Sequence, residues 1–206
     1  MTLKIYGIAA SRAVRTLWMA EELGLSYEHV PVSYMGGGAR TPEMLALNPN
    51  GHIPVIDDDG LVVWESLAIN LYLARKHGGP LAAATLAEEA AVLQWSFWVG
   101  NECEKDALAI LMHRMGLPED QRDLSVAEQA GKRLRAPFGV LEAHLAGREY
   151  IAADRFTVAD LNCACVLTWA RADAELMAAH PHVAAWLKRC LAREGFQKAK
   201  SAGKPA

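Results

Sequence analysis

The spacing of apolar residues along the chain changes near residue 78. Before that point, short apolar runs alternate with segments of helical period, which predicts strands over 3–6 and 27–32 and helices over 12–23 and 66–77. The first two strands are expected to be parallel, because a right-handed crossover joins them. Asp59-Gly60 separates two further apolar runs and predicts a hairpin, since glycine tolerates the positive φ of such turns. We therefore expect a βαβ unit followed by ββα.

After Gly78-Gly79-Pro80 the pattern is helical throughout. Long periodic segments cover 86–114, 125–145, 157–170 and 183–193 with short links, as in a helical bundle. Pro137 falls inside the second segment and predicts a kink or break there. Thr157 and Asp160 have the spacing of a capping box at the start of the third. We divide the chain into an α/β domain over 1–78, a linker over 79–85 and an all-α domain over 86–206, which ends in a short polar tail at 203–206.

Charge and composition narrow the classes of partner. The net charge is −3, from 21 basic and 24 acidic residues, and no basic stripe is present, so we expect no nucleic-acid partner. The chain starts in a strand pattern without the hydrophobic region of a signal peptide, and no apolar run is long enough to cross a bilayer. We therefore expect a cytoplasmic protein with no membrane partner.

The cysteines and histidines do not predict a metal site. No pair of cysteines has C-x-x-C spacing, and a cytoplasmic setting favours reduced thiols, so we interpret all four as small core residues. They are Cys103, Cys163, Cys165 and Cys190. The only close histidine pair, His180 and His182, fits the entry of a helix, and we expect no metal.

Residues 48–73 carry the most specific motif in the chain. Gly51-His-Ile-Pro-Val55 fits the pattern G-x-[IV]-P-[VA], and the following helix opens on Glu65-Ser66. Together they resemble the glutathione-binding half of the cytosolic glutathione S-transferases. The capping box with its preceding Phe156, and the segment 180–187, also resemble this family, so the resemblance covers almost the whole chain. It implies a thioredoxin-like N-terminal domain with a cis Pro54, an all-helical C-terminal domain, and a homodimer.

Ser11 is the candidate catalytic residue. It stands four residues after Gly7. This spacing resembles that of the active serine in the phi, tau and related bacterial classes of the family. A hydroxyl at a helix start can donate to a bound thiolate, and the helix dipole adds to this stabilisation. Two alternatives stay open at this point: Ser11 is only a helix cap, or Tyr6 is the active residue, as tyrosine is in other classes.

The other candidate residues follow from the chemistry of glutathione and from the family resemblance. The Glu65 carboxylate suits the γ-glutamyl ammonium, while the Ser66 hydroxyl and the helix N–H groups suit the adjacent carboxylate. The Ile53 backbone, before Pro54, is expected to pair with the cysteinyl residue of glutathione. Arg40, on a glycine-rich loop that we expect to be mobile, and His52 are candidates for the glycine carboxylate. His52 departs from the glutamine or lysine usual in the family.

The resemblance implies a glutathione S-transferase that passes the sulfur of glutathione, its co-substrate, to a small hydrophobic electrophile. One alternative is glutathione-dependent reduction of disulfides or peroxides, although the Ser11 turn has no cysteine. Another is a non-catalytic binding module built on the same fold. Such modules usually lose the serine, the acid or the proline loop, and all three are present here.

Overall fold

The computed structural model describes residues 2–202. They form two compact units, an α/β unit that runs to Ala82 and includes the chain from Ala192 onward, and a helical unit over Ala83–Leu191. The boundaries expected at 78 and 86 stay predictions, whereas the segment after Ala192 was counted with the helices and in the structure groups with the α/β unit. The polar tail expected at 203–206 lies outside the described residues.

The α/β unit contains a four-stranded sheet in the order β2-β1-β3-β4. β2 is parallel to β1, and β3 is antiparallel to both β1 and β4, which confirms the predicted crossover and hairpin. The strands are β1 (Leu3–Tyr6), β2 (Tyr27–Val30), β3 (Val55–Asp58) and β4 (Leu61–Trp64). Asp59 and Gly60 have φ values of 52° and 91°, as a tight hairpin turn requires.

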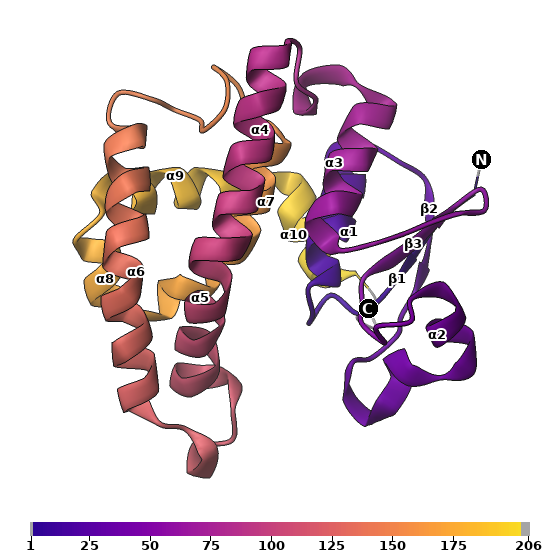
Figure 1. The fold of residues 1–206 in the computed structure, drawn as a ribbon, viewed down its shortest axis with the longest axis horizontal. Coiled ribbons are helices and arrows are strands. Elements are labelled where there is room, and N and C mark those ends of the chain that lie inside the picture. The colour runs from indigo at the N-terminus through magenta and orange to yellow at the C-terminus, as the bar shows by residue number, and fades with distance from the viewer. Residues whose placement is uncertain (1, 203–206) are drawn as a thin grey trace. The chain divides into compact units, whose positions relative to one another are not determined.

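Helices cover both faces of this sheet. α1 (Ala13–Glu22) and α3 (Ser66–His77) contact each other and cover one face (Figure 1). On the other face, Met44 of α2 (Pro42–Leu47) packs with Val55 and Tyr6. Tyr6 therefore packs against the cluster on this face and is partly buried there. The apolar side chains buried on each face explain why the sheet needs helices on both sides.

The region between β2 and β3 differs from its prediction. Residues expected to form a mobile glycine loop make a short 3₁₀ segment, η1 (Met35–Arg40), in which Gly36 and Gly37 have positive φ. α2 follows at once and was not predicted. Its sequence signal was Thr41-Pro42, because Thr41 accepts a hydrogen bond from the N–H of Met44 at 3.4 Å and proline suits the first helical position.

The last helix, α10 (Glu194–Ser201), packs on α1 within the α/β unit. The Glu22 carboxylate accepts two hydrogen bonds from Arg193, at 2.9 and 2.7 Å, and one from the indole of Trp18 at 2.8 Å. The rings of Trp18 and Phe196 also contact each other, with centroids 4.8 Å apart and planes tilted by 58°. A buried aromatic pair and a bidentate ion pair therefore explain why the C-terminal segment leaves the helical unit.

The helical unit consists of α4 (Leu86–Trp98), α5 (Glu104–Leu111), α6 (Leu124–Leu145), α7 (Val158–Leu167), α8 (Ala174–Ala178) and α9 (Pro181–Leu191). Short helical turns join them at Val99–Cys103 (η3), Met112–Gly116 (η4), Glu119–Gln121 (η5) and Thr168–Ala172 (η6), while η2 (Gly79–Leu81) belongs to the α/β unit. The single helix predicted over 86–114 is therefore divided by the π-turn η3.

Of the kink or break expected at Pro137, the break does not occur, because α6 continues through this residue. Proline removes one helical hydrogen bond. On either side of it, however, Leu134, Phe138 and Leu141 are fully buried. Burial of these side chains outweighs the loss of one hydrogen bond, since fully burying a leucine or phenylalanine contributes about 1.5–3 kcal/mol.

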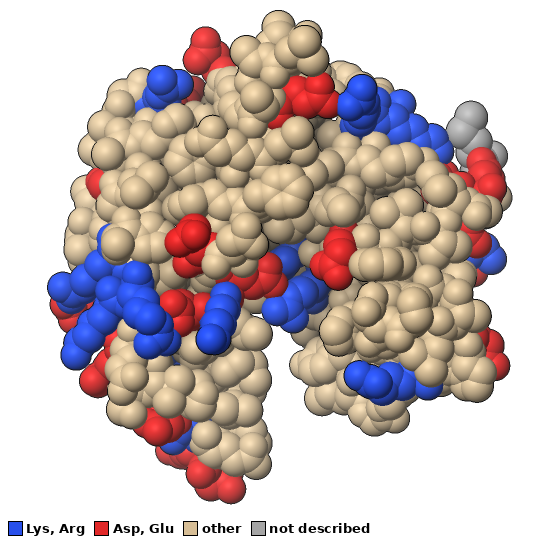
Figure 2. All heavy atoms as spheres, viewed as in Figure 1, with Lys and Arg blue, Asp and Glu red and all other residues tan. Residues whose placement is uncertain are grey.

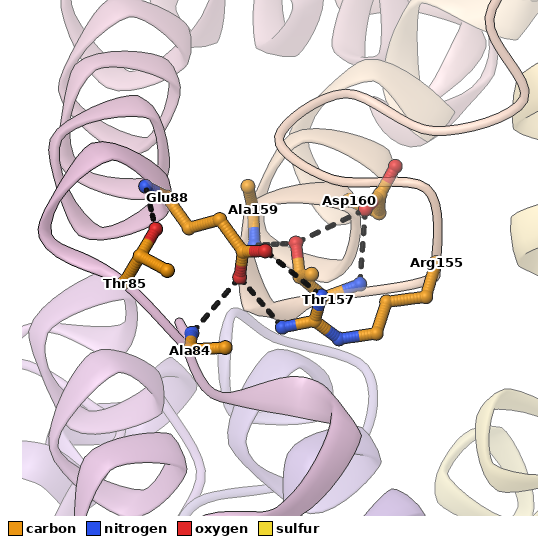
Figure 3. A network of polar contacts seen from close by, with 7 residues as sticks. All are labelled: Ala84, Thr85, Glu88, Arg155, Thr157, Ala159 and Asp160. Carbon is orange, nitrogen blue, oxygen red and sulfur yellow. Dashed lines mark hydrogen bonds and ion pairs between the residues drawn. The ribbon is translucent and has the colours of Figure 1, made fainter.

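α7 is buried along its whole length and begins with the predicted capping box. The Asp160 carboxylate accepts hydrogen bonds from the N–H and hydroxyl of Thr157, at 3.0 and 3.2 Å (Figure 3). Its other oxygen accepts from the N–H of Ile151 and the indole of Trp186, each at 2.9 Å. Burial raises the pKa of Asp160, while these four donors favour the ionised form. The box therefore links α7 to α9 and to the preceding loop.

The four cysteines are buried and none of them forms a disulfide bond, as predicted. Burial raises the pKa of Cys103 to about 12, which keeps the thiol protonated and unreactive. Within residues 2–202, no helix has the length and apolar character needed to cross a membrane. Acidic and basic side chains both occur over the visible surface (Figure 2). Some of the basic side chains are paired, as Arg133 is with Asp106.

Candidate functional site

The register of the sheet brings three predicted site segments to one end of the α/β unit. Tyr6 pairs with Val55, and Val55 pairs with Trp64. Three segments therefore leave the sheet at the same end of its strands, which we call the site edge. They are the turn that follows β1, the proline loop that precedes β3 and the helix start that follows β4. Motifs separated by about fifty residues in sequence meet there for this reason.

Gly7 allows the turn after β1 to pack closely against its neighbours. Its φ is +134°, and a Cβ placed on it would lie 2.6 Å from Cβ of Ala13 and 3.3 Å from Cβ of Ile53. The backbone N–H of Gly7 donates to the carbonyl of Val30 at 2.9 Å, and its carbonyl lies 2.7 Å from Nε2 of His29. Any larger residue here would push α1 and the proline loop away from the turn.

The hydroxyl of Ser11 lies at the N-terminal end of α1 and is half-buried. It donates a hydrogen bond to the carbonyl of Ile8 at 2.7 Å and accepts one from the N–H of Ala13 at 3.1 Å. Ser11 therefore holds the first residue of α1 through its side chain, although the N-cap position itself is Arg12, which forms no side-chain capping bond. The catalytic role of Ser11 stays a prediction, and its position beside the first turn of α1 is compatible with that role.

The proline loop is held by a residue that the sequence analysis missed. The Ile53–Pro54 peptide is cis, as the family resemblance implied. Asn48 is buried, donates through its amide to the carbonyl of His52 at 2.9 Å, and accepts from the N–H of Asn50 at 3.1 Å. Its signal in the sequence was the turn-forming run Asn48-Pro-Asn-Gly51, which is typical of an Asx turn.

Arg40 and the proline loop lie side by side. Gly51 has a φ of +65°, and a Cβ on it would lie 2.9 Å from Cγ of Arg40. The side chain of Arg40 is exposed and forms no ion pair with the described residues, and His52, next in the chain to Gly51, is also exposed. Both side chains are thus available at this edge, while their role in binding a carboxylate stays a prediction.

The start of α3 combines a strained residue with a buried one. Glu65 has φ +73° and ψ 108°, which for a residue other than glycine costs on the order of 1–3 kcal/mol. Strain of this kind is concentrated at functional sites. Ser66 is 5% exposed, and its Oγ accepts a hydrogen bond from Nη1 of Arg15 at 3.2 Å. The sequence analysis did not single out Arg15, because nothing in a helical repeat marks an arginine as buried.

The edge therefore offers complementary groups for a short extended peptide that carries charges at both ends. A carboxylate and a hydroxyl lie at the start of α3, an unpaired arginine lies by the proline loop, and a serine hydroxyl lies at the start of α1. The backbone beside a cis proline can pair with the middle of such a peptide.

Two family models and a curated relative match this chain. The family model described as "Glutathione S-transferase, N-terminal domain" matches residues 1–75, and that described as "Glutathione S-transferase, C-terminal domain" matches residues 103–194. Glutathione S-transferase 3 of Zea mays is 38% identical over 209 residues, which cover 97% of this chain and 94% of the relative.

Two solved structures are similar over nearly the full length. Glutathione S-transferase I from maize, in complex with an atrazine glutathione conjugate, has a TM-score of 0.86 at 32% identity and covers 99% of each chain. Glutathione transferase F7 from Populus trichocarpa has a TM-score of 0.87 at 29% identity and covers 96% of this chain and 97% of its own. Because both domains match and the identity extends along almost the whole sequence, the chain belongs to the glutathione S-transferase family.

Proposed function

We propose that this chain is a serine-type glutathione S-transferase, which binds glutathione, stabilises its thiolate with Ser11 and transfers it to a small hydrophobic electrophile. The observation that carries the proposal is the meeting of the Ser11 turn, the cis Ile53–Pro54 peptide and Glu65-Ser66 at one end of the sheet. A similar structure, that of the maize enzyme, is described with a glutathione conjugate of atrazine.

Each part of glutathione has a partner at this edge. The Ile53 backbone pairs with the cysteinyl residue as a short additional strand. Glu65 binds the γ-glutamyl ammonium, and Ser66 with the N–H groups of α3 binds the neighbouring carboxylate. Arg40 and His52 face the glycine carboxylate from adjacent loops, and Arg40 supplies the stronger interaction because it is always charged.

Activation of the thiol follows from the position of Ser11. Its hydroxyl hydrogen, which now bonds to the carbonyl of Ile8, rotates to the bound sulfur, and the N-terminal end of α1 adds a favourable dipole. The thiol of glutathione releases its proton to solvent, and the thiolate sulfur then forms a bond to the electrophilic carbon. In a substitution the leaving group departs with its bonding electron pair, and in an addition the resulting carbanion takes up a proton from water. Catalysis comes from the larger thiolate fraction and from positioning.

The test is the titration of bound glutathione in Ser11→Ala. We expect the thiolate absorbance to titrate near ~8.5, the pKa of an ordinary thiol, in the variant and lower in the wild type. Ser11→Thr keeps a hydroxyl and is the matched control. An unchanged titration in Ser11→Ala would remove Ser11 from the mechanism. Failure of the wild-type protein to bind glutathione at millimolar concentration in calorimetry would remove the function itself.

We also propose that the protein is a homodimer in the cytoplasm. Each unit has exposed apolar side chains that a second copy can cover. They are Leu61 and Trp64 on β4, and Leu86, Leu93 and Phe97 on α4. The four thiols, none of which is in a disulfide, suit a reducing compartment, which is also where reduced glutathione is available.

A further inference from the structure

A buried arginine lies directly behind the start of α3. Arg15 is in the first turn of α1, is only 1% exposed, and donates from Nη1 to Oγ of Ser66 at 3.2 Å. The two residues are 51 positions apart in the sequence. A guanidinium cannot be deprotonated in a protein, so this contact places a permanent positive charge beside the Ser66 hydroxyl.

This contact determines what the Ser66 hydroxyl can do. A hydroxyl has one hydrogen to donate and two lone pairs that accept, whereas a guanidinium only donates. Ser66 must therefore accept from Arg15, and within the described residues its own hydrogen is not engaged in a hydrogen bond. Ser66 is left as a donor next to a positive charge, a combination that favours an anionic oxygen over an ammonium or an amide N–H.

We propose that Arg15 is a positioning residue that sets the orientation of the γ-glutamyl end of glutathione through Ser66. It directs the α-carboxylate to Ser66 and leaves the ammonium to Glu65, the preceding residue. Arg15 acts through Ser66 and does not contact the peptide. The inference rests on the proposed function and specifies which residue makes this subsite selective for a carboxylate.

The experiment compares two ligands on the full chain by calorimetry. The first is glutathione, and the second is 4-aminobutyryl-cysteinyl-glycine, which lacks only the γ-glutamyl α-carboxylate. We expect Arg15→Met to weaken glutathione binding by roughly tenfold or more, the effect of losing one charge-assisted hydrogen bond. Binding of the analogue, which has no carboxylate to place, is expected to change by less than about threefold. Arg15→Lys should fall between wild type and Arg15→Met for glutathione.

Two further measurements separate positioning from a general structural role. Arg15→Met combined with Ser66→Ala should bind glutathione no worse than Ser66→Ala alone, because both changes remove the same interaction. The KM for glutathione should rise while kcat and the titration of the bound thiol stay near wild type. Arg75→Met, the same kind of change on an exposed arginine of α3, is the matched control and should alter none of these values.

Several outcomes would overturn the proposal. They are equal losses for the two ligands, additive effects of Arg15→Met and Ser66→Ala, or a wild-type protein that binds both ligands equally well. The last result would leave the proposed function intact, whereas absence of glutathione binding to the wild type would remove both. If Arg15→Met does not fold, as judged by circular dichroism, the same comparison is made with Arg15→Lys.

Discussion

The hydroxyl of Ser11 serves the fold and is also suited to the proposed chemistry, because the two roles use different atoms. It accepts from the N–H of Ala13 through a lone pair and donates its hydrogen to the carbonyl of Ile8. A thiolate competes only for the hydrogen, so the hydrogen bond from Ala13 can persist while the sulfur is stabilised. The sequence analysis treated a structural and a catalytic role of Ser11 as alternatives, and in this geometry the two roles are compatible.

Gly7 is the residue whose substitution has the clearest steric consequence. In Gly7→Ala the new Cβ would lie 2.6 Å from Cβ of Ala13, in addition to the unfavourable φ of +134°. We expect the free energy of unfolding to fall by about 1–3 kcal/mol from the backbone conformation alone, and further from the clash. Urea denaturation followed by circular dichroism measures the change.

The control for this prediction is Gly24→Ala. Gly24 also has a positive φ, 64°, but a Cβ there meets nothing within 4 Å. It should therefore show the cost of the backbone conformation without the clash. Equal losses in the two variants would show that the turn after β1 gives way at little cost, against the close packing described here.

At the scale of elements, a single ion pair joins the start of α4 to the loop that precedes α7. Arg155 donates to the two oxygens of Glu88 at 3.1 and 2.6 Å, and the N–H of Ala84 donates to the same carboxylate at 2.9 Å (Figure 3). The pair lies next to the capping box of Thr157 and Asp160. The N-terminal ends of both helices are thus tied together by side chains 67 residues apart.

This ion pair predicts a specific dependence of stability on pH. Hydrogen bonds from Arg155 and from the N–H of Ala84 lower the pKa of Glu88 to about 2, from an ordinary value of 4.5. Because the pKa is lowered in the folded state, the stabilisation is complete above pH 4.5 and is lost as the pH falls through about 2. The difference in unfolding free energy between wild type and Glu88→Gln should therefore shrink over this range.

Acid-dependent denaturation of both proteins gives this difference at each pH. Glu194→Gln is the control, because Glu194 forms an exposed i,i+4 pair with Lys198 and such pairs contribute little. Its difference from wild type should stay small at every pH. A Glu88→Gln difference that does not change between pH 5 and pH 2 would contradict the assignment of the lowered pKa to folding.

At the scale of the whole molecule, the exposed apolar residues suit contact with a second copy of the chain. Phe97 and Leu86 are 64% and 83% exposed on α4, and Leu61 on β4 is 50% exposed. Leu86, Leu93 and Phe97 are spaced by seven and four residues, so they form a stripe along one face of the helix. Contact between copies of the chain would remove this stripe from water, which favours association.

We expect the wild type to sediment at twice the mass of the chain and Phe97→Glu to shift toward the monomer. A charge placed in an apolar interface carries a desolvation cost that the free chain does not bear. Val140→Glu, which changes an exposed apolar residue on α6, is the control and should leave the mass unchanged. A monomeric wild type at micromolar concentration, or an unchanged mass for Phe97→Glu, would rule out this face.

Local residue preferences were enough to predict most elements. The helix over 66–77, the hairpin at Asp59-Gly60 and the capping box at Thr157 were predicted correctly, because each depends on a few neighbouring residues. α2 was missed, and of the kink or break predicted at Pro137 the break was wrong. For α2, the short signal Thr41-Pro42 was not recognised as a helix start. For α6, burial of side chains on either side of Pro137 outweighed the local preference of proline.

The sequence by itself determined most of the order of strands and helices, the family, and the candidate residues of its motifs. Only the tertiary structure decided which distant groups meet: Arg15 with Ser66 across 51 residues, and Glu22 with Arg193 across 171. Periodicity and turn preferences are properties of neighbouring residues, so they specify elements. A contact between elements depends on how buried surfaces pack, and no local pattern encodes the partner that a buried charge will find.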